Sequence, residues 1–251
     1  MIRPEEATSN NVYDKCAESY GYDIDSALSS RLKYNLLNKY IDSNYTVLDA
    51  GCGNGIYIQA VAHYCTRIIG IDINDKMLFF AREKLQEKGI KNAELYKQSC
   101  SSLQFEDNSF DLVYSFSTLL LIPDFFLAIK QLLRILKPRG IAILDITGRY
   151  NLSQIYWSRY YRSHGHFGVN SFSHKAIAEL FLQLNSEVIE EHALGFTDQW
   201  KYLPLLRCAT ILDRLFHKGN SLDLDYLISN IRLLFPLANR WYIVSRKSAD
   251  M

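Results

Sequence analysis

Two aspartates and a glycine-rich turn mark where this chain could hold a small molecule. Residues 47–55 read Val-Leu-Asp-Ala-Gly-Cys-Gly-Asn-Gly and lead directly into the apolar stretch 56–60. Glycine lacks a Cβ atom, so a ligand can approach such a turn closely, and a helix that begins there offers free N–H groups. Asp72 ends a second apolar stretch, where a carboxylate can accept hydrogen bonds from ribose hydroxyls. The pattern therefore indicates a site for an adenosine-containing ligand.

Alternating strands and helices must position these residues. Short apolar runs predict strands at 46–49, 67–71, 93–97, 110–115 and 141–146. Helical spacing and caps predict helices at about 55–64, from Asn74 onward and at about 124–136, the last ending at the Lys-Pro-Arg-Gly turn of 137–140. This order predicts an α/β fold: a doubly wound, Rossmann-like, mostly parallel sheet of about seven strands with helices on both faces.

The two ends of the chain are predicted to cover this core. Leucines at 28, 32, 36 and 37 predict an N-terminal helix, and 13–20 is tyrosine-bearing and helix-compatible. Ser173 is a candidate helix cap, and the last strands are expected near 187–190 and 241–244. Two apolar helices between 203 and 235 would form an insertion that caps a pocket or makes a dimer contact. We thus divide one domain, 1–251, into a lid (1–44), a cofactor-binding core (45–147) and a substrate cover (148–251).

Composition limits the classes of partner. The formal net charge of +1 argues against a polyanionic partner, so no nucleic acid is expected. Five widely spaced cysteines without a Cys-x-x-Cys motif predict free thiols in a reducing compartment and no metal site. The sequence shows no signal-peptide pattern and no uncharged apolar stretch of membrane-spanning length. A cytoplasmic protein, monomeric or homodimeric, is the expectation.

Further motifs distinguish among nucleotide folds. The turn lacks the Gly-Lys-Ser/Thr of a phosphate-binding loop and the third glycine of the dinucleotide spacing, which leaves an NAD-dependent dehydrogenase as a distant alternative. Asp49 to Gly55, Asp72, the segments 103–113 and 119–124, and the Arg-Ile-Leu-Lys-Pro-Arg-Gly of 134–140 follow one another at characteristic spacings. In this order the chain resembles class I S-adenosylmethionine-dependent methyltransferases, over roughly residues 45–147.

The resemblance implies a role for each matching position. The backbone of the glycine turn would pass the methionine part of the cofactor, with Asp49 near its amino group. Asp72 would hold both ribose hydroxyls, and Ser99-Cys100 stands where relatives often carry Asp-Ala at the adenine edge. The tyrosines of the N-terminal segment would close over the cofactor. The implied S-adenosylmethionine-binding residues are Tyr13, Tyr20, Asp49, Ala50, Gly51, Cys52, Gly53, Asn54, Gly55, Asp72, Ile73, Met77, Ser99, Cys100, Ser101, Ser115 and Phe116.

Methyl transfer places few demands on the protein beyond alignment. The sulfonium methyl is already electrophilic, so the enzyme must place a nucleophile behind it and exclude water. Relatives often carry a histidine in the segment that matches 119–124, and this chain has leucines there. His164 and His166 are the next candidates for a catalytic base, although an ordinary loop role is the simpler interpretation. Cys52 is better explained as a small residue in a tight turn than as a nucleophile.

Residues 148–178 form the most unusual stretch, because they contain seven aromatic residues of the Tyr, Trp and Phe types and no acid. Tyr156 and Tyr160, like Trp157 and Tyr161, are four apart and would stack on a helix. The stretch could line a pocket for an aromatic, lipid-like or anionic acceptor, or touch a membrane surface. A helix packed on the sheet edge with solvated arginines is an equally good interpretation.

The sequence therefore predicts a methyltransferase of the EC 2.1.1 type that acts on a small-molecule acceptor by in-line displacement. A protein or RNA methyltransferase is the first alternative, although residues 115–118 (Ser-Phe-Ser-Thr) lack the tetrad typical of base-amino methylation. A non-catalytic cofactor-binding scaffold on the same fold is the second. The acceptor itself and the atom that receives the methyl group are left open.

Overall fold

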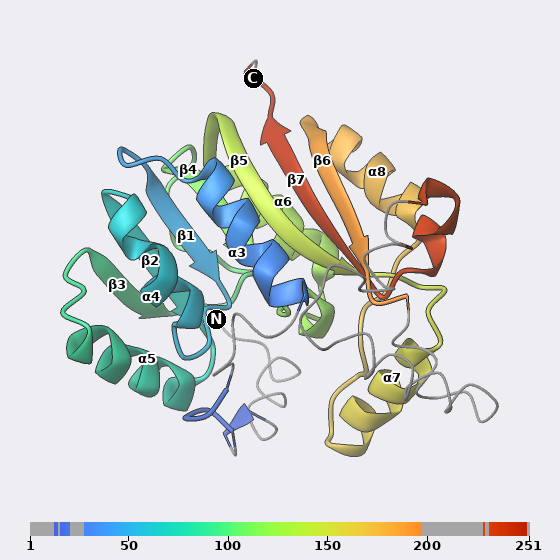
Figure 1. Cartoon of the computed structure of the whole chain (residues 1–251), viewed down its shortest axis with the longest axis horizontal. Helices are drawn as coiled ribbons and strands as arrows, with labels where there is room; N and C mark the ends of the chain where they lie inside the picture. The colour runs from blue at the N-terminus through green and yellow to red at the C-terminus, as the bar shows by residue number, and fades with distance from the viewer. Residues whose placement is uncertain (1–12, 15, 21–27, 197–227, 229–230, 250–251) are drawn as a thin grey trace.

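The structure is a computed structural model that describes residues 13–14, 16–20, 28–196, 228 and 231–249. Seven strands form one sheet in the order β3-β2-β1-β4-β5-β7-β6 (Figure 1). β1 to β5 are parallel, and β7 runs antiparallel to both of its neighbours. The strands are β1 (Thr46–Ala50), β2 (Arg67–Asp72), β3 (Ala93–Lys97), β4 (Phe110–Ser115), β5 (Leu136–Thr147), β6 (Ser186–Leu194) and β7 (Arg240–Lys247).

Helices cover both faces of this sheet (Figure 1). On one face the apolar sides of α3, α4 and α5 pack on alternate residues of β1, β2 and β4; on the other face α6 and α8 pack on the intervening residues. Burial on both faces explains the nearly continuous apolar runs of the parallel strands. The helical elements are α3 (Leu28–Tyr40), α4 (Ile56–Val61), η1 (Ala62–Tyr64), α5 (Asp75–Glu87), η2 (Leu119–Leu121), α6 (Phe125–Ile135), α7 (Ser153–Ser163), α8 (His174–Gln183) and η5 (Arg232–Leu237).

The predicted caps and strands are confirmed. The side chain of Asn74 accepts a hydrogen bond from the Met77 N–H at the start of α5, and Ser173 accepts one from Ala176 at the start of α8. Both side chains satisfy a backbone donor that the first turn of a helix leaves free. The fold class is therefore confirmed as a doubly wound α/β sheet with helices on both faces.

The predicted turn at 137–140 is wrong. The four residues lie inside β5, which pairs Leu136 with Phe110 and Ile141 with Leu112. β4 thus advances by two residues while β5 advances by five, so the excess residues bulge out of the ladder, with Arg139 at a φ of 65°. Proline and glycine indeed end α6, but an irregular strand absorbs them just as a turn would.

Other predicted element boundaries also differ from those of the structure. The α-helix expected at 55–64 is α4, which ends at Val61 and continues as the 3-10 turn η1. In the segment 13–20, Tyr13 is helical, whereas Asp14 and residues 16–20 form turns. Of the helices predicted between 203 and 235, residues 203–227 lie outside the described residues, and the described end is η5. The division into lid, core and cover stays a prediction.

Candidate functional site

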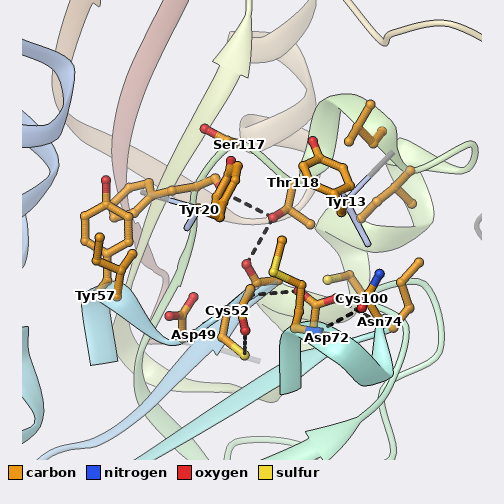
Figure 2. Close-up of a pocket in the computed structure, with 18 of the residues that line it drawn as sticks. Tyr13, Tyr20, Asp49, Cys52, Tyr57, Asp72, Asn74, Cys100, Ser117 and Thr118 are labelled. Atoms are coloured by element: carbon orange, nitrogen blue, oxygen red, sulfur yellow. Dashed lines mark hydrogen bonds between the residues drawn. The ribbon is translucent and has the colours of Figure 1, made fainter. Parts of the chain in front are cut away.

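A cavity of about 340 Å³ opens at the carboxyl ends of β1, β2 and β4 (Figure 2). This edge is where parallel α/β sheets bind ligands, because helix starts and loops converge there. In Figure 2, Asp72, Asn74 and Cys100 lie on one side of the cavity, whereas Tyr57 and Asp49 lie on the other. The described part of the N-terminal segment, with Tyr13 and Tyr20, also lines the cavity.

The structure brings most of the predicted cofactor residues to this cavity. Twelve of the seventeen line it: Tyr13, Tyr20, Asp49, Gly51, Cys52, Gly53, Asp72, Ile73, Met77, Ser99, Cys100 and Phe116. Five do not contribute to its lining: Ala50, Asn54, Gly55, Ser101 and Ser115. The hydroxyl of Ser115 donates to the Ala50 carbonyl at 2.7 Å, so this side chain ties β4 to β1. The assignment of all seventeen to cofactor binding stays a prediction.

The glycine turn follows β1 in a left-handed backbone conformation. Gly51 has a φ of +84°, and a Cβ atom built on it would lie 2.1 Å from the Thr118 hydroxyl. Only glycine fits a position that combines this dihedral angle with so close a neighbour. The N–H groups of Gly51 and Cys52 both donate to the Ile71 carbonyl, at 2.8 and 2.9 Å. The turn is thereby fixed against the end of β2, and Gly51 and Gly53 line the cavity.

Asp72 links the turn to the start of α5. Its Oδ2 accepts from the Gly53 N–H at 2.9 Å, and its Oδ1 accepts from the Asn74 N–H at 2.9 Å. Burial raises the pKa of this carboxyl, while the backbone donors, including the Ile73 N–H, oppose that rise. Each carboxylate oxygen can accept a second hydrogen bond. Asp72 can therefore hold the turn and still receive ligand hydroxyls from the cavity.

Asp49 is the most buried acid of the site. Its side chain receives a hydrogen bond from the Tyr114 hydroxyl at 3.0 Å, and the residue is 2% exposed. Burial raises its pKa to about 8; the Tyr114 bond opposes this shift, and the charge of Asp72 adds to it. Removal from water disfavours a charge unless a partner compensates it. A cationic group of a ligand beside Asp49 would be such a partner.

The loop after β3 forms the other wall of the cavity. Gln98, Ser99 and Cys100 line it, and the Ser99 hydroxyl accepts from the Ser101 N–H at 3.1 Å. The Ser99 hydroxyl therefore stabilises the loop that lines this wall. Burial raises the pKa of the Cys52 thiol well above its usual value, so this thiol stays protonated. The interpretation of Cys52 as a small turn residue is thereby supported.

Contacts from the core hold the N-terminal segment over the cavity. The Asn54 side-chain amide donates to the carbonyls of Ala17 and Tyr20, at 2.9 and 2.8 Å. From the opposite direction, the hydroxyls of Tyr13 and Tyr161 lie 3.0 Å apart, which joins the segment to α7. Asn54 thus binds the N-terminal segment and does not line the cavity itself.

The two candidate histidines lie elsewhere. His164 is exposed at the end of α7, with its Nδ1 2.8 Å from the Tyr160 carbonyl. His166 is buried, and its Nδ1 and Nε2 face the carbonyls of Gly168 and Leu121 at 2.8 and 3.0 Å. Neither histidine lines the cavity. Both contacts of His166 favour a structural role, and catalysis by either residue stays a prediction.

We expect His166→Ala to destabilise the fold and His164→Ala to leave it nearly unchanged. The first substitution removes the ring N–H that donates to one of the two buried carbonyls and opens a void, which costs about 1–3 kcal/mol. The second removes an exposed side chain and should change the free energy of unfolding by less than about 0.5 kcal/mol. Urea unfolding followed by circular dichroism measures both. Equal free energies of unfolding for the two variants would contradict the structural role of His166.

A lysine that the sequence interpretation missed lies in the cavity wall. Lys33 of α3 is 7% exposed, lines the cavity and donates to the Ser117 hydroxyl at 3.1 Å. It shares the inward face of the helix with Leu36 and Leu37, which are three and four residues further on. A lysine at that spacing from two inward leucines was the available signal.

The other missed lining residues come from α3, α4, η2 and loops. They include Tyr57 on α4 and Thr118 in the loop after β4, whose hydroxyl donates to the Phe116 carbonyl at 3.1 Å. Ser117 has a φ of 57°, which a non-glycine residue rarely adopts. The full set is Ser30, Lys33, Ile56, Tyr57, Asn74, Gln98, Ser117, Thr118, Leu121 and Ile122.

The described part of the chain lacks the features of a metal site and of a membrane-spanning helix. Its histidines, cysteines, aspartates and glutamates form no cluster of three or more that could hold a metal ion. Among the helices described, none combines the length and the apolar character that crossing a membrane requires.

Known proteins share this architecture. A demethylmenaquinone methyltransferase from Listeria welshimeri is 29% identical in an alignment of 154 positions that covers 58% of this chain and 65% of that protein. The match thus spans just under two thirds of the relative. Phosphoethanolamine N-methyltransferase 2 of Haemonchus contortus, solved with S-adenosyl-L-methionine, superposes with a TM-score of 0.68 at 19% identity over 98% of this chain and 60% of that one. The [4+2]-cyclase SpnF superposes with a TM-score of 0.68 at 17% identity, over 100% of this chain and 98% of that one. Both likenesses concern the fold alone.

A sequence profile described as a methyltransferase domain matches residues 41–194, which are more than half of the chain. The matched range begins just before β1 and ends with β6, so it includes the glycine turn, Asp49 and Asp72. Profile, sheet order and cavity agree with one another. The chain belongs to the methyltransferase-domain family of class I S-adenosylmethionine-dependent methyltransferases.

Proposed function

We propose that the protein transfers the methyl group of S-adenosylmethionine to a small-molecule acceptor by in-line displacement. The observation that carries the proposal is one cavity that joins Asp72 and the glycine turn to a further wall formed by Lys33, Tyr57 and Ser117. A cofactor held at the first end would present its sulfonium toward the space at the other. Alignment of the two reactants and exclusion of water supply the catalysis that such a reaction needs.

The acceptor is proposed to be an aromatic or lipid-like molecule. The curated relative from Listeria welshimeri is named for demethylmenaquinone, which has an aromatic ring system and a lipid tail. In this chain, rings of Tyr13, Tyr20, Tyr57 and Phe116 line the cavity, and flat apolar surfaces favour aromatic ligands. A covered cavity of about 340 Å³ suits a small molecule better than a protein side chain or an RNA base on its polymer.

The outer face of α7 supports the proposal of a membrane surface contact. Ile155, Tyr156 and Trp157 are 56%, 46% and 38% exposed. The predicted stack of Tyr156 on Tyr160 is confirmed, with ring centroids 6.4 Å apart and an angle of 17°. Aromatic and aliphatic side chains exposed together on one helix favour an apolar partner.

The proposed function is tested with S-adenosylmethionine that carries a deuterated methyl group. The protein is incubated with 1,4-naphthohydroquinone, a simple phenol, a primary amine and a thiol, and products are identified by mass spectrometry. The expected result is a deuterated methyl group on the aromatic acceptor. Binding of the cofactor without transfer to any acceptor would favour the non-catalytic alternative.

Asp49 gives the cofactor site a predicted pH dependence. Burial raises the pKa of Asp49 to about 8, and a ligand ammonium placed beside it would lower that pKa. Binding then expels a proton, so affinity for S-adenosylhomocysteine should rise from about pH 5.5 to 7.5, by at most about tenfold per unit. Calorimetry at several pH values measures this. Asp49→Asn should flatten the profile, and an affinity of the unmodified protein that is flat or falls over this range contradicts the assignment.

A further inference from the structure

A cluster of two cations and one carboxylate lies at the end of the cavity that Lys33, Tyr57 and Ser117 line, which we call the inner end. Lys33 of α3 and Arg240 at the start of β7 approach the same oxygen, Asp145 Oδ2, at 3.5 and 3.6 Å. The Asp145 side chain is 1% exposed and that of Lys33 9%. Asp145 Oδ1 is already used, because it accepts from the Ser117 N–H at 2.8 Å. The cluster is built from three elements that lie far apart in sequence.

The charges of this cluster do not balance. Two positive groups share one negative group, which leaves one positive charge in excess. Within the described residues, the Arg240 Nη1 is buried and has no hydrogen-bond partner. Buried charges are costly unless they are paired and hydrogen-bonded. Among the residues that the structure describes, this cluster therefore lacks one anionic group.

Lys33 is the member of the cluster that faces the cavity. Its Nζ donates to the Ser117 hydroxyl, and Ser117 lines the cavity as well. Three aromatic rings surround the ammonium, with that of Phe116 closest at 5.3 Å from its centroid. Burial lowers the pKa of Lys33 and Asp145 opposes this, so one shared carboxylate does not fully compensate the charge.

Lys33 lies away from Asp72 in the cavity, which determines the part of a bound ligand that it can reach. Ser117 and Tyr57 lie away from Asp72 and Cys100 in Figure 2. Lys33 contacts both of the former, through its hydrogen bond to Ser117 and its approach to the Tyr57 ring at 5.9 Å. With adenosine held at Asp72, the groups nearest Lys33 would be the amino-acid end of the cofactor or the acceptor.

We propose that Lys33 is a binding residue for an anionic oxygen of the ligand that occupies the inner end of the cavity, with Arg240 held behind it through Asp145. The anionic oxygen belongs either to the carboxylate of the cofactor or to an acidic group of the acceptor. The inference rests on the proposed function for the placement of the ligand. Its test measures binding, so failure of methyl transfer on every acceptor does not decide it.

The test compares Lys33→Met with Lys39→Met, a matched control on the exposed side of the same helix. Calorimetry measures the dissociation constants of S-adenosylhomocysteine and of its decarboxylated form S-adenosyl-3-thiopropylamine. In the presence of S-adenosylhomocysteine, it also measures the dissociation constants of anionic 1-hydroxy-2-naphthoate and neutral 1-naphthol. If the cofactor supplies the anion, Lys33→Met weakens S-adenosylhomocysteine about ten- to hundredfold and leaves the decarboxylated form unchanged. If the acceptor supplies the anion, Lys33→Met weakens only the binding of the naphthoate.

Lys33→Gln is a second variant that protects the test against misfolding. Like Lys33→Met it leaves Asp145 paired with Arg240, and it retains an amide donor for the Ser117 hydroxyl. Circular dichroism confirms the fold of each variant before binding is measured. Affinities of both Lys33 variants that match those of Lys39→Met for S-adenosylhomocysteine, with no difference between the naphthoate and the naphthol, overturn the proposal.

Discussion

Asp72→Asn is expected to weaken binding of S-adenosylhomocysteine about ten- to hundredfold. The carboxylate accepts from the Gly53 and Asn74 N–H groups, and in the proposed complex it also accepts from the ribose hydroxyls. An amide has one acceptor oxygen, so it cannot serve donors on both sides. Hydrogen bonds to a charged group contribute about 1.5–3 kcal/mol, and each 1.4 kcal/mol is a factor of ten in affinity. Isothermal titration calorimetry measures the loss.

The same substitution should remove a pH-dependent cost of folding, while it also leaves one of the Gly53 and Asn74 N–H donors without its acceptor oxygen. Burial raises the pKa of Asp72 above 3.8, so the folded protein binds this proton more tightly than the unfolded chain does. Ionisation therefore costs folding free energy as the pH rises through this window, and asparagine removes that cost. Asp75→Asn is the control, because its side chain is 77% exposed and three residues away. An unchanged affinity for Asp72→Asn, or equal losses in both variants, would contradict the ribose assignment.

Gly51→Ala is expected to abolish cofactor binding and to lower the free energy of unfolding by about 2–5 kcal/mol. The added Cβ would lie 2.1 and 2.4 Å from Thr118 Oγ1 and Cγ2, so either the turn or the loop after β4 must move. Both segments line the cavity. The displacement should therefore reach the ligand as well as the fold, and urea unfolding and calorimetry report the two effects separately.

Gly89→Ala separates backbone strain from the steric clash at Gly51. Gly89 also has a left-handed backbone, with a φ of +65°, but a Cβ atom there meets nothing within 4 Å. We expect its cost to be only that of the dihedral angle, about 1–2 kcal/mol, with cofactor affinity unchanged. Equal destabilisation by the two alanines would show that contact with Thr118 does not constrain the turn.

The central part of the fold could be predicted because its signals are local. The parallel strands β1, β2 and β4 are short, mostly apolar runs, and residues such as Asn74 and Ser173 cap helices through contacts three residues away. The site residues at the ends of β1 and β2 follow from the same order, because parallel strands bring their carboxyl ends to one edge. The bulge at 137–140 was missed because proline and glycine have the same local preferences in a turn and in an irregular strand.

The inner end of the cavity could not be predicted because it depends on contacts between distant segments. Lys33, Asp145 and Arg240 come from α3, β5 and β7, and nothing in their local sequence indicates that they meet. His166 shows the opposite case: its residue type suggested chemistry, but its two ring nitrogens face backbone carbonyls. A side chain's role in these positions follows from its partners, which only the folded chain supplies.

Calorimetric titration of the unmodified protein with S-adenosylhomocysteine tests the central claim most directly. The cavity at Asp49, the glycine turn and Asp72 predicts one ligand per chain, with a dissociation constant below about 100 μM, or roughly 5.5 kcal/mol of binding free energy. NAD, titrated alongside, should bind more weakly. Absence of saturable binding up to about 1 mM, or tighter binding of NAD, would contradict the assignment of this cavity to the methyl donor.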